Sequence, residues 1–357
     1  MRRTVHEPKI AFLFSSSRAG LLEGAEEGLE PDTALRGFNY MPNAEAINIA
    51  EAKHPLLLVL RLLRYDFVVA SDTLLLGYLV SILGRLKRHK TQWVYVAITS
   101  STLMRRHAAH QTKLFLLKRF WKSYGYIICL SQNQRTDFLS AGVRAEKLEF
   151  IPIGIDAAFY DAARKKSAGE SDGKFVLSVG RDAGRDYATL LEAARRSEYP
   201  FVIVASERIL PRSTPLPENV AVHYNLSARA VRDLYAQARL VAVASKAEDV
   251  PEGSDCSGQT VVLDALATGK PVVATERSWI ADYFVPGEDL SVVPASDPAS
   301  LAAAIELLWQ DSVLAEHMAR SGCGKVHSRY TTEAFARQLG QILQGAHICD
   351  NLESSLK

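Results

Sequence analysis

The segment between Asp255 and Thr275 has residue types that suit an anionic ligand, because a loop of small residues opens a helix that leads into an apolar strand. At the start of this helix lie Ser257, Gly258, Gln259 and Thr260. The first N–H groups of a helix have no acceptor within it, and the helix dipole makes that end positive, so a phosphate fits there. Asp264 follows about one turn later, where it would accept hydrogen bonds from hydroxyls. The segment predicts a nucleotide or nucleotide-sugar site; the alternative is an ordinary loop with a solvated Asp264.

A second candidate anion site is a basic turn that follows the expected strand 175–180. Gly180 and Gly184 allow the chain to turn before a helix that begins near Asp186, and Arg181 and Arg185 lie at the mouth of the turn. Two guanidinium groups beside a helix N-terminus suit a diphosphate. The glycine spacing is not that of a dinucleotide-binding fingerprint. Two solvated arginines in an ordinary turn are the alternative.

The elements that must position these loops are short apolar strands that alternate with helical periodicity. Continuous apolar strands separated by helices are typical of parallel sheets covered on both faces. We therefore predict an α/β fold with two Rossmann-like, doubly wound domains. The expected strands are 10–15, 67–71, 93–99, 126–131, 148–153, 175–180, 201–206, 220–224, 240–245, 271–275 and 290–294.

A chain of 357 residues is long enough for two such domains. The boundary is expected within 152–174, where a strand passes through Pro152 and Gly154 into a polar stretch. We expect an N-terminal domain at 1–155, a C-terminal domain at 156–330, and a final helix and tail at 331–357 that packs back on the N-terminal domain.

Composition argues against several classes of protein. The cysteines are few and widely separated, so we expect a reducing cytosol, no disulfide and no zinc site. The apolar part of the first 17 residues is shorter than a signal peptide requires. The longest apolar stretch, 74–83, is shorter than the roughly 20 residues that span a bilayer. We therefore expect a cytoplasmic protein.

Charge is unevenly distributed along the chain. No acidic residue occurs between Asp72 and Asp137, although basic residues are frequent there. Within 105–124, apolar residues recur at helical spacing among lysines and arginines: Leu114, Leu117, Trp121 and Tyr124. Such a helix suits an anionic membrane surface; packing of its apolar side on the N-terminal sheet is the alternative. Nucleic acid is not expected as a partner, because no recognition motif accompanies the charges.

Four segments, taken in order and spacing, resemble the retaining glycosyltransferases of family four. They are IPIGID (151–156), SVGRDAGRDYATLLEA (178–193), LSARAVRDLYAQARLVAVAS (226–245) and SGQTVVLDALATGKPVVAT (257–275). The resemblance covers roughly residues 125–345 well and the first half loosely. It implies the GT-B fold, in which the second Rossmann-like domain binds the nucleotide-sugar and the first carries most of the acceptor site.

The resemblance also implies roles for single residues. Arg181 and Arg185 match the basic pair that neutralises the donor diphosphate in place of a metal, so we expect no metal and no cofactor. Gly180 belongs to the same donor-binding turn. Asp264 matches the second Glu of the family's paired-Glu motif and would hold the ribose hydroxyls.

Two further loops match the family's donor site. The loop from Ser257 to Thr260 corresponds to the one whose amides meet the phosphate and the donor sugar. In the N-terminal half, Ser17 and Gly20 lie in the turn that corresponds to a loop near the diphosphate, although the usual pair of glycines is missing.

The sequence also departs from the family pattern. Cys256 stands where the first motif Glu is usual, so the carboxylate that meets the donor sugar is absent or supplied by Asp255 or Glu252. Ile98 and Thr99 end a strand where many members have a His. His107 and His110 are the nearest substitutes, and both suit packed or solvated positions as well.

We therefore expect a retaining, metal-independent glycosyltransferase that takes a nucleotide-diphosphate-sugar donor. Its acceptor is an unidentified saccharide, lipid-linked or small-molecule hydroxyl, and a peripheral membrane location through 105–124 stays open. The alternatives are a GT-B epimerase or phosphorylase, and a non-catalytic protein that binds sugar nucleotides. Release of free nucleotide only when an acceptor is present would separate transfer from the first two.

Overall fold

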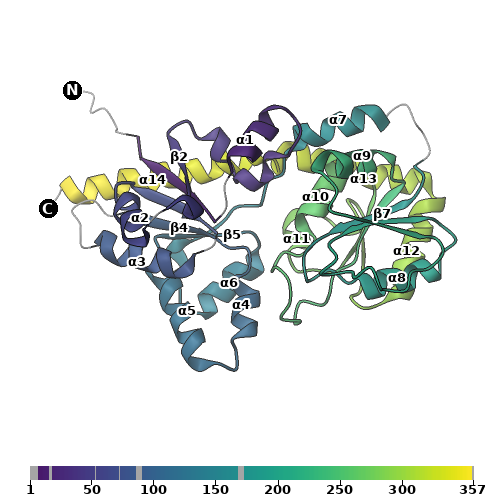
Figure 1. The fold of residues 1–357 in the computed structure, drawn as a ribbon, viewed down its shortest axis with the longest axis horizontal. Helices are drawn as coiled ribbons and strands as arrows, with labels where there is room; N and C mark the ends of the chain where they lie inside the picture. The colour runs from purple at the N-terminus through teal and green to yellow at the C-terminus, as the bar shows by residue number, and fades with distance from the viewer. Residues whose placement is uncertain are drawn as a thin grey trace. The chain divides into compact units, whose positions relative to one another are not determined.

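The computed structural model describes residues 7–15, 18–52, 54–71, 73–85, 91–167 and 173–355 (Figure 1). It divides into two compact units. Unit 1 comprises Met1–Glu26, Asp32–Gly154 and Thr332–Lys357, and unit 2 comprises Glu27–Pro31 and Ile155–Thr331. The final helix is therefore part of the N-terminal unit, and a short early segment, which we did not expect there, is part of unit 2.

Unit 1 is built on a six-stranded sheet in the order β2-β1-β3-β4-β5-β6, with every neighbouring pair parallel. Its strands are β1 (Ile10–Phe14), β2 (Ala44–Asn48), β3 (Phe67–Ala70), β4 (Gln92–Val96), β5 (Tyr126–Cys129) and β6 (Leu148–Phe150). Its helices are α1 (Ala19–Glu26), α2 (Pro55–Leu62), α3 (Leu74–Arg85), α4 (Ser100–Arg106), α5 (Gln111–Ser123), α6 (Gln132–Ser140) and α14 (Thr332–Ser355), with short 3-10 turns η1 (Asp32–Leu35), η2 (Phe38–Tyr40), η3 (Ile49–Glu51) and η4 (Ala145–Lys147).

Unit 2 repeats this plan with a parallel six-stranded sheet in the order β12-β11-β10-β7-β8-β9. Its strands are β7 (Val176–Gly180), β8 (Phe201–Ala205), β9 (Val220–Tyr224), β10 (Leu240–Val243), β11 (Val272–Thr275) and β12 (Ser291–Val293). Its helices are α7 (Ala157–Ser167), α8 (Tyr187–Arg195), α9 (Ala228–Gln237), α10 (Gln259–Ala267), α11 (Ile280–Tyr283), α12 (Pro298–Gln310) and α13 (Ser312–Arg329). Two doubly wound parallel sheets confirm the predicted fold class.

The expected strands all form, but β2 was missed. Its sequence AEAIN combines Glu45 and Asn48 with two small alanines, and Ile47 is the one residue of the strand that is buried. Because β2 lies at the edge of the sheet, half of its surface faces away from the core, so it lacks the continuous apolar run by which the other strands were recognised.

Three helices of unit 2 begin at N-cap residues, and the start predicted near Asp186 is among them. Asp186, Ser227 and Asp297 each accept a hydrogen bond from a backbone N–H in the first turn of α8, α9 and α12. Pro298 occupies the first turn of α12, where its missing N–H costs nothing. Helices α8 and α12 contact each other on one face of the sheet, and α7 contacts both α9 and α10 on the opposite face (Figure 1).

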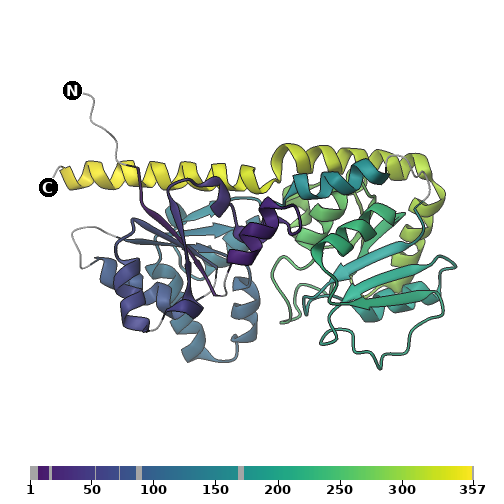
Figure 2. The same ribbon diagram turned by 45° about the horizontal axis from the view of Figure 1, so that its top comes forward.

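Helix α14 is held against the rest of unit 1 by a buried polar contact and by a close approach to Gly37. The buried Asp32 carboxylate accepts hydrogen bonds from Thr332 Oγ1 and from Asn39 Nδ2. Gly37 has φ of 79°, and a Cβ there would lie 2.7 Å from Ala336 Cβ. Figure 2 shows α14 (yellow) running beside the purple strands of unit 1.

Gly37→Ala should therefore destabilise unit 1. The left-handed backbone costs a residue with Cβ about 1–2 kcal/mol, and the new methyl would also displace α14. Gly345→Ala is the matched control, because Gly345 is helical and a Cβ there has nothing within 4 Å; it should stabilise by up to about 1 kcal/mol. Urea unfolding measures both, and equal stability of the two variants would contradict the packing described.

Candidate functional site

The candidate donor residues of unit 2 gather where the strand order reverses. The chain runs outward from β7 through β8 to β9, then returns to place β10 on the other side of β7. Loops that leave the carboxyl ends of β7 and β10 therefore separate to opposite faces and leave a crevice between them, which is the usual ligand site of an open α/β sheet. The first loop is 181–186 and the second is 244–258.

Arg185 lies at the bottom of this crevice with only 2% of its surface exposed. Its Nη2 donates to Val179 O at 2.9 Å and its Nη1 to Ser245 Oγ at 3.5 Å. A Cβ at Gly180 would lie 2.4 Å from Nε, and one at Gly258 would lie 2.9 Å from Nη1. Both glycines therefore make room for the guanidinium, which links β7, β10 and the start of α10.

Within the part of the chain that the structure describes, this buried cation has no acidic partner. Among the described residues, no carboxylate forms an ion pair with Arg185, and its Nε has no hydrogen-bond acceptor. A buried unpaired charge is costly in free energy. An anionic ligand at this point would offset that cost.

Arg181 differs from Arg185, although the sequence placed both at the mouth of the turn. The Arg181 side chain is exposed, and its Nη2 donates to Leu226 O at 3.3 Å. The Arg185 side chain is instead buried at the bottom of the crevice. The two cations therefore have different surroundings: Arg181 is exposed to solvent, whereas Arg185 is buried.

The N-terminus of α10 opens into the same crevice. Gly258 is its N-cap with φ of 84° and no side-chain cap. Within the described chain, the backbone N–H groups of Gly258, Thr260 and Val261 have no acceptor, whereas that of Gln259 donates to Cys256 O. The Ser257 hydroxyl is also buried without a partner. These donors, together with the helix dipole, make a site for phosphate oxygens.

Asp182 holds the two loops together, and sequence reasoning missed it. Its carboxylate accepts hydrogen bonds from Gly184 N at 2.8 Å and from Ser254 N at 3.0 Å. Gly253, with φ of 80°, allows the second loop to approach, since a Cβ there would lie 2.3 Å from Asp182 Oδ1. The partners are far apart in sequence, so no local pattern could reveal this contact.

Asp264 lies on α10 and receives a hydrogen bond from the Tyr160 hydroxyl of α7. Burial raises the pKa of Asp264 from about 3.8 to about 8, and the nearby Asp156 adds to the rise, although the Tyr160 hydrogen bond opposes it. The ring of Tyr235 lies edge-on to that of Tyr160, with 5.9 Å between the ring centroids. The buried Tyr235 hydroxyl has no hydrogen-bond partner among the described residues. Asp264 is therefore protonated at neutral pH and can donate as well as accept a hydrogen bond.

The departures from the family pattern cluster at the end of the second loop. Asp255 is buried, and its backbone carbonyl accepts a hydrogen bond from Arg277 Nη2 at 2.9 Å. Arg277 also lies 3.4 Å from Glu248. Burial raises the pKa of the Cys256 thiol, so this side chain is neutral and does not replace the charge of a Glu.

The candidates in unit 1 are less informative. Ser17 lies outside the described residues. Gly20 is in the first turn of α1, and a Cβ there would meet nothing within 4 Å, so no close approach requires the glycine. His107 ends α4 and His110 precedes α5, with their rings 6.3 Å apart.

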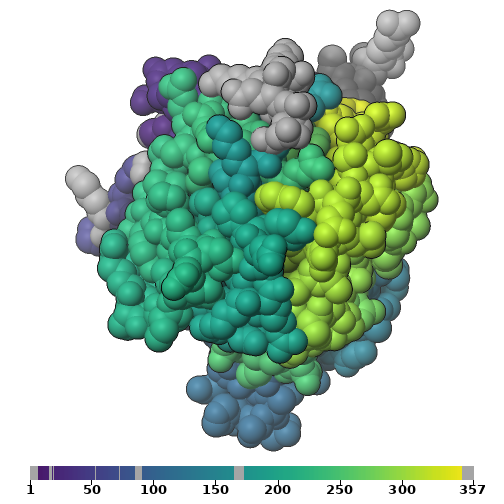
Figure 3. All heavy atoms as spheres, turned by 90° about the vertical axis from the view of Figure 1, so that its right-hand side faces the viewer, coloured from purple at the N-terminus to yellow at the C-terminus, as the bar shows by residue number. Residues whose placement is uncertain are grey.

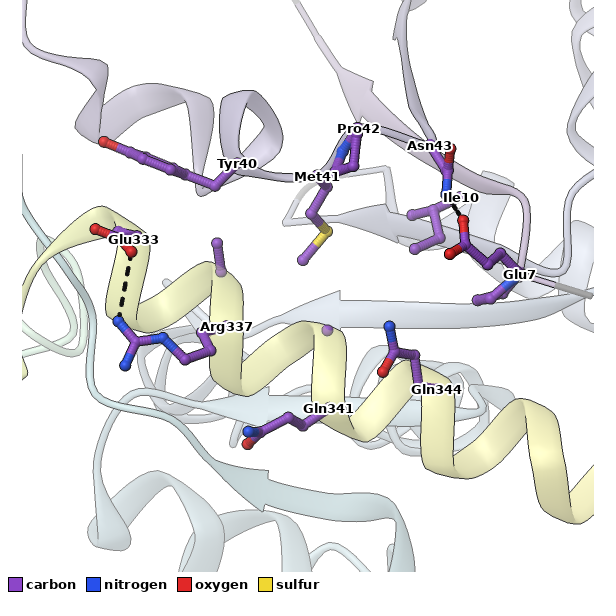
Figure 4. A pocket seen from close by; sticks show the side chains of 13 residues that line it. Glu7, Ile10, Tyr40, Met41, Pro42, Asn43, Glu333, Arg337, Gln341 and Gln344 are labelled. Atoms are coloured by element: carbon purple, nitrogen blue, oxygen red, sulfur yellow. Dashed lines mark hydrogen bonds and ion pairs between the residues drawn. The ribbon is translucent and has the colours of Figure 1, made fainter. Parts of the chain in front are cut away.

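Unit 1 also contains a pocket of about 440 Å³ between α14 and the segment from β1 to β2 (Figure 4). The Glu333–Arg337 ion pair lies on its helical wall, and a hydrogen bond from Asn43 to Glu7 closes one end. Both charges on the helix are paired with each other. None of the predicted site residues lines this pocket.

Comparisons with known proteins agree with these observations. A family model described as glycosyl transferases group 1 matches residues 174–311, and one described as Glycosyltransferase Family 4 matches residues 6–159. Among curated proteins, a phosphatidyl-myo-inositol mannosyltransferase of Mycobacterium leprae is 31% identical over 29% of this chain, and the D-rhamnosyltransferase WbpZ of Pseudomonas aeruginosa is 25% identical over 60%. The matched parts span 28% and 58% of those relatives' lengths.

Solved structures share the fold at low sequence identity. Anabaena Alr3699/HepE, in complex with UDP-glucose, has a TM-score of 0.71 and 20% identity, with 95% of this chain and 100% of that chain covered. Sucrose-phosphate synthase from Thermosynechococcus elongatus has a TM-score of 0.69 and 19% identity, with 96% and 100% covered.

Asp264→Asn should remove part of the pH dependence of stability. Between roughly pH 4 and pH 8 the folded protein holds a proton on Asp264 that the unfolded chain has released, so the wild-type free energy of unfolding falls as pH rises through this window. The Asn side chain is neutral throughout this range. The free energy of unfolding of the variant should therefore fall less with rising pH, and the variant should be relatively more stable near pH 8. Urea unfolding across this range measures the difference; parallel profiles would show that Asp264 titrates normally.

Proposed function

This chain belongs to the glycosyltransferases of family four, and we propose that it transfers a sugar from a nucleotide-diphosphate-sugar donor to an acceptor hydroxyl with retention at the anomeric carbon. The observation that carries this proposal is the buried Arg185 guanidinium, which has no acidic partner in the described chain and lies beside the uncapped start of α10. A donor diphosphate supplies the missing negative charge.

The geometry suits departure of a diphosphate. As the bond from the anomeric carbon to the diphosphate oxygen breaks, negative charge grows on the leaving phosphate. Arg185 is already fixed by Val179 and Ser245, so it stabilises that charge without reorganising. Arg181, the Ser257 hydroxyl and the amides of α10 add donors, and a stabilisation that grows toward the transition state raises the rate. We propose that these groups take the place of a metal ion.

Asp264 and Tyr160 then suit the nucleoside. A protonated carboxyl and a hydroxyl beside it offer both donor and acceptor atoms to ribose hydroxyls. The structure of Anabaena Alr3699/HepE was determined with UDP-glucose, which supports UDP-glucose as the first donor to test.

We also propose that the acceptor is lipid-linked and reached at the inner face of a membrane by a cytoplasmic protein. Two observations support this: one curated relative is named for phosphatidyl-myo-inositol, and unit 1 carries the acid-free basic run. No helix among the described residues is long and apolar enough to cross a membrane.

A second candidate is a protein that binds a sugar nucleotide without transferring the sugar. The neutral Cys256 at the first Glu position favours it, because the nearest carboxylate, Asp255, is buried. Release of free nucleotide only when an acceptor is present distinguishes transfer from this candidate and from an epimerase or a phosphorylase.

Arg181→Ala and Arg185→Met should each weaken binding of the nucleoside diphosphate. Loss of a charge-assisted hydrogen bond costs about 1.5–3 kcal/mol, or roughly 10- to 150-fold in affinity. Arg185→Met removes a buried unpaired charge and should leave the free energy of unfolding of the ligand-free protein within about 1 kcal/mol of wild type, or above it. Calorimetry with UDP and urea unfolding measure the two effects.

Arg196→Ala is the matched control, since Arg196 is an exposed arginine of unit 2 that pairs with Glu192. It should bind UDP like wild type. Wild-type affinity in both site variants would refute the assignment of the donor site. Loss of binding in all three would indicate an effect of net charge instead.

A further inference from the structure

Helices α2 and α3 of unit 1 present rows of leucines outward. Leu58, Val59 and Leu62 of α2 and Val80 of α3 are buried in the core. The opposite faces carry large apolar side chains with 37–68% of their surface exposed: Leu56, Leu57, Leu60, Leu75, Leu79 and Leu83. Leucines spaced by four residues on an outward helix face form a continuous apolar stripe. A contiguous exposed apolar surface marks an interaction site.

Helix α5 extends this surface, though not through the residues that the sequence suggested. Leu117, Trp121 and Tyr124 are in the core of unit 1, so the packing alternative holds for that side of the helix. Its exposed apolar residues are instead Phe115 and Leu116, at 63% and 43% exposure.

The three helices lie side by side on one face of the sheet. Residues of α2, α3 and α5 belong to one core cluster with alternate residues of the strands, and α3 contacts both α2 and α5. Figure 1 shows α3 between the other two. We call the exposed side of α2, α3 and α5, defined by the leucines above with Phe115 and Leu116, the leucine face.

A groove of about 400 Å³ between α3 and α5 adds positive charge to the leucine face. Tyr78, Ile82 and Phe115 supply its apolar part, and Lys118, Arg119 and Lys122 its cations. Arg119 donates to the Tyr78 hydroxyl at 2.7 Å, so it is held in place. Neither Lys118 nor Lys122 forms an ion pair with a carboxylate of the described chain, and no acidic residue occurs between Asp72 and Asp137 to neutralise them.

We propose that the leucine face docks on an anionic phospholipid surface, with the leucines and Phe115 entering the boundary between headgroups and acyl chains and the two lysines meeting lipid phosphates. Apolar side chains flanked by unpaired cations are the combination that interfacial helices use. A second copy of the chain fits less well, because a two-fold contact would bring the same basic groove against itself.

The inference rests on the proposed function in one respect: docking on the membrane would give the enzyme access to the proposed lipid-linked acceptor. Vesicle binding itself needs neither donor nor acceptor. Failure of vesicle binding with intact UDP binding would therefore refute docking alone, whereas failure of UDP binding would refute the proposed donor site alone.

The test is co-sedimentation with phosphatidylcholine vesicles that contain or lack phosphatidylglycerol. Wild type should bind only the vesicles with phosphatidylglycerol, less so as salt is added. Combined Leu56→Gln, Leu60→Gln, Leu75→Gln and Leu79→Gln should lower the partition coefficient about tenfold or more. Lys118→Glu with Lys122→Glu should lower it by a similar factor. Arg119 is left unchanged because of its bond to Tyr78.

The control is Leu307→Gln with Val313→Gln. These residues are similarly exposed, at 51% and 78%, on α12 and α13 of unit 2 (yellow-green in Figure 3). The control should bind vesicles like wild type, and all variants should keep wild-type circular dichroism and UDP affinity. Wild-type partitioning in both leucine-face variants would overturn the proposal. So would a concentration-dependent dimer that the four Gln substitutions dissociate while wild type ignores vesicles.

Discussion

The proposed donor site of unit 2 depends on the burial of one cation, Arg185, between the carboxyl ends of β7 and β10. A guanidinium needs space and acceptors, and the structure provides them through two glycines, the Val179 carbonyl and the Ser245 hydroxyl. No carboxylate within the described chain balances the charge. This constraint explains why small residues surround the crevice and why α10 begins without a side-chain cap. The protein holds these donors in place before any ligand arrives, which is the arrangement that favours binding of a charged group.

The sequence was a good guide to the fold and a partial guide to this site. Apolar strand runs and N-cap residues are local signals, so the positions of the strands other than β2 along the chain, and the start of α8 near Asp186, could be predicted. The types of residue at Gly180, Arg185 and Gly258 also pointed to an anion. Whether an arginine is exposed or buried depends on the opposite loop, so the difference between Arg181 and Arg185 could not be foreseen.

Long-range contacts account for the other misses. Asp182 meets Ser254 and Asp264 meets Tyr160 only after the sheet has brought separate loops and helices together. A helical spacing of apolar residues on α5 shows that one side is apolar but not whether core or solvent lies beside it. Leu117 and Trp121 proved to be core. The exposed leucines of α2 and α3 could not be separated from their buried neighbours by sequence, because nearly every residue of those helices is apolar.

The path of the chain between its two units has a consequence for biosynthesis. The chain leaves unit 1 at Gly154, forms nearly all of unit 2, and returns at Thr332 to add α14 to unit 1. A ribosome adds roughly 5–20 residues per second, and domains generally fold as they emerge. Unit 2 can therefore complete its sheet while unit 1 still lacks the helix that covers Gly37 and meets Asp32. A chain that ended before Thr332 would keep the proposed donor residues of unit 2 but would expose the surface of unit 1 that α14 covers, and incompletely folded surfaces are what cellular chaperones and proteases act on.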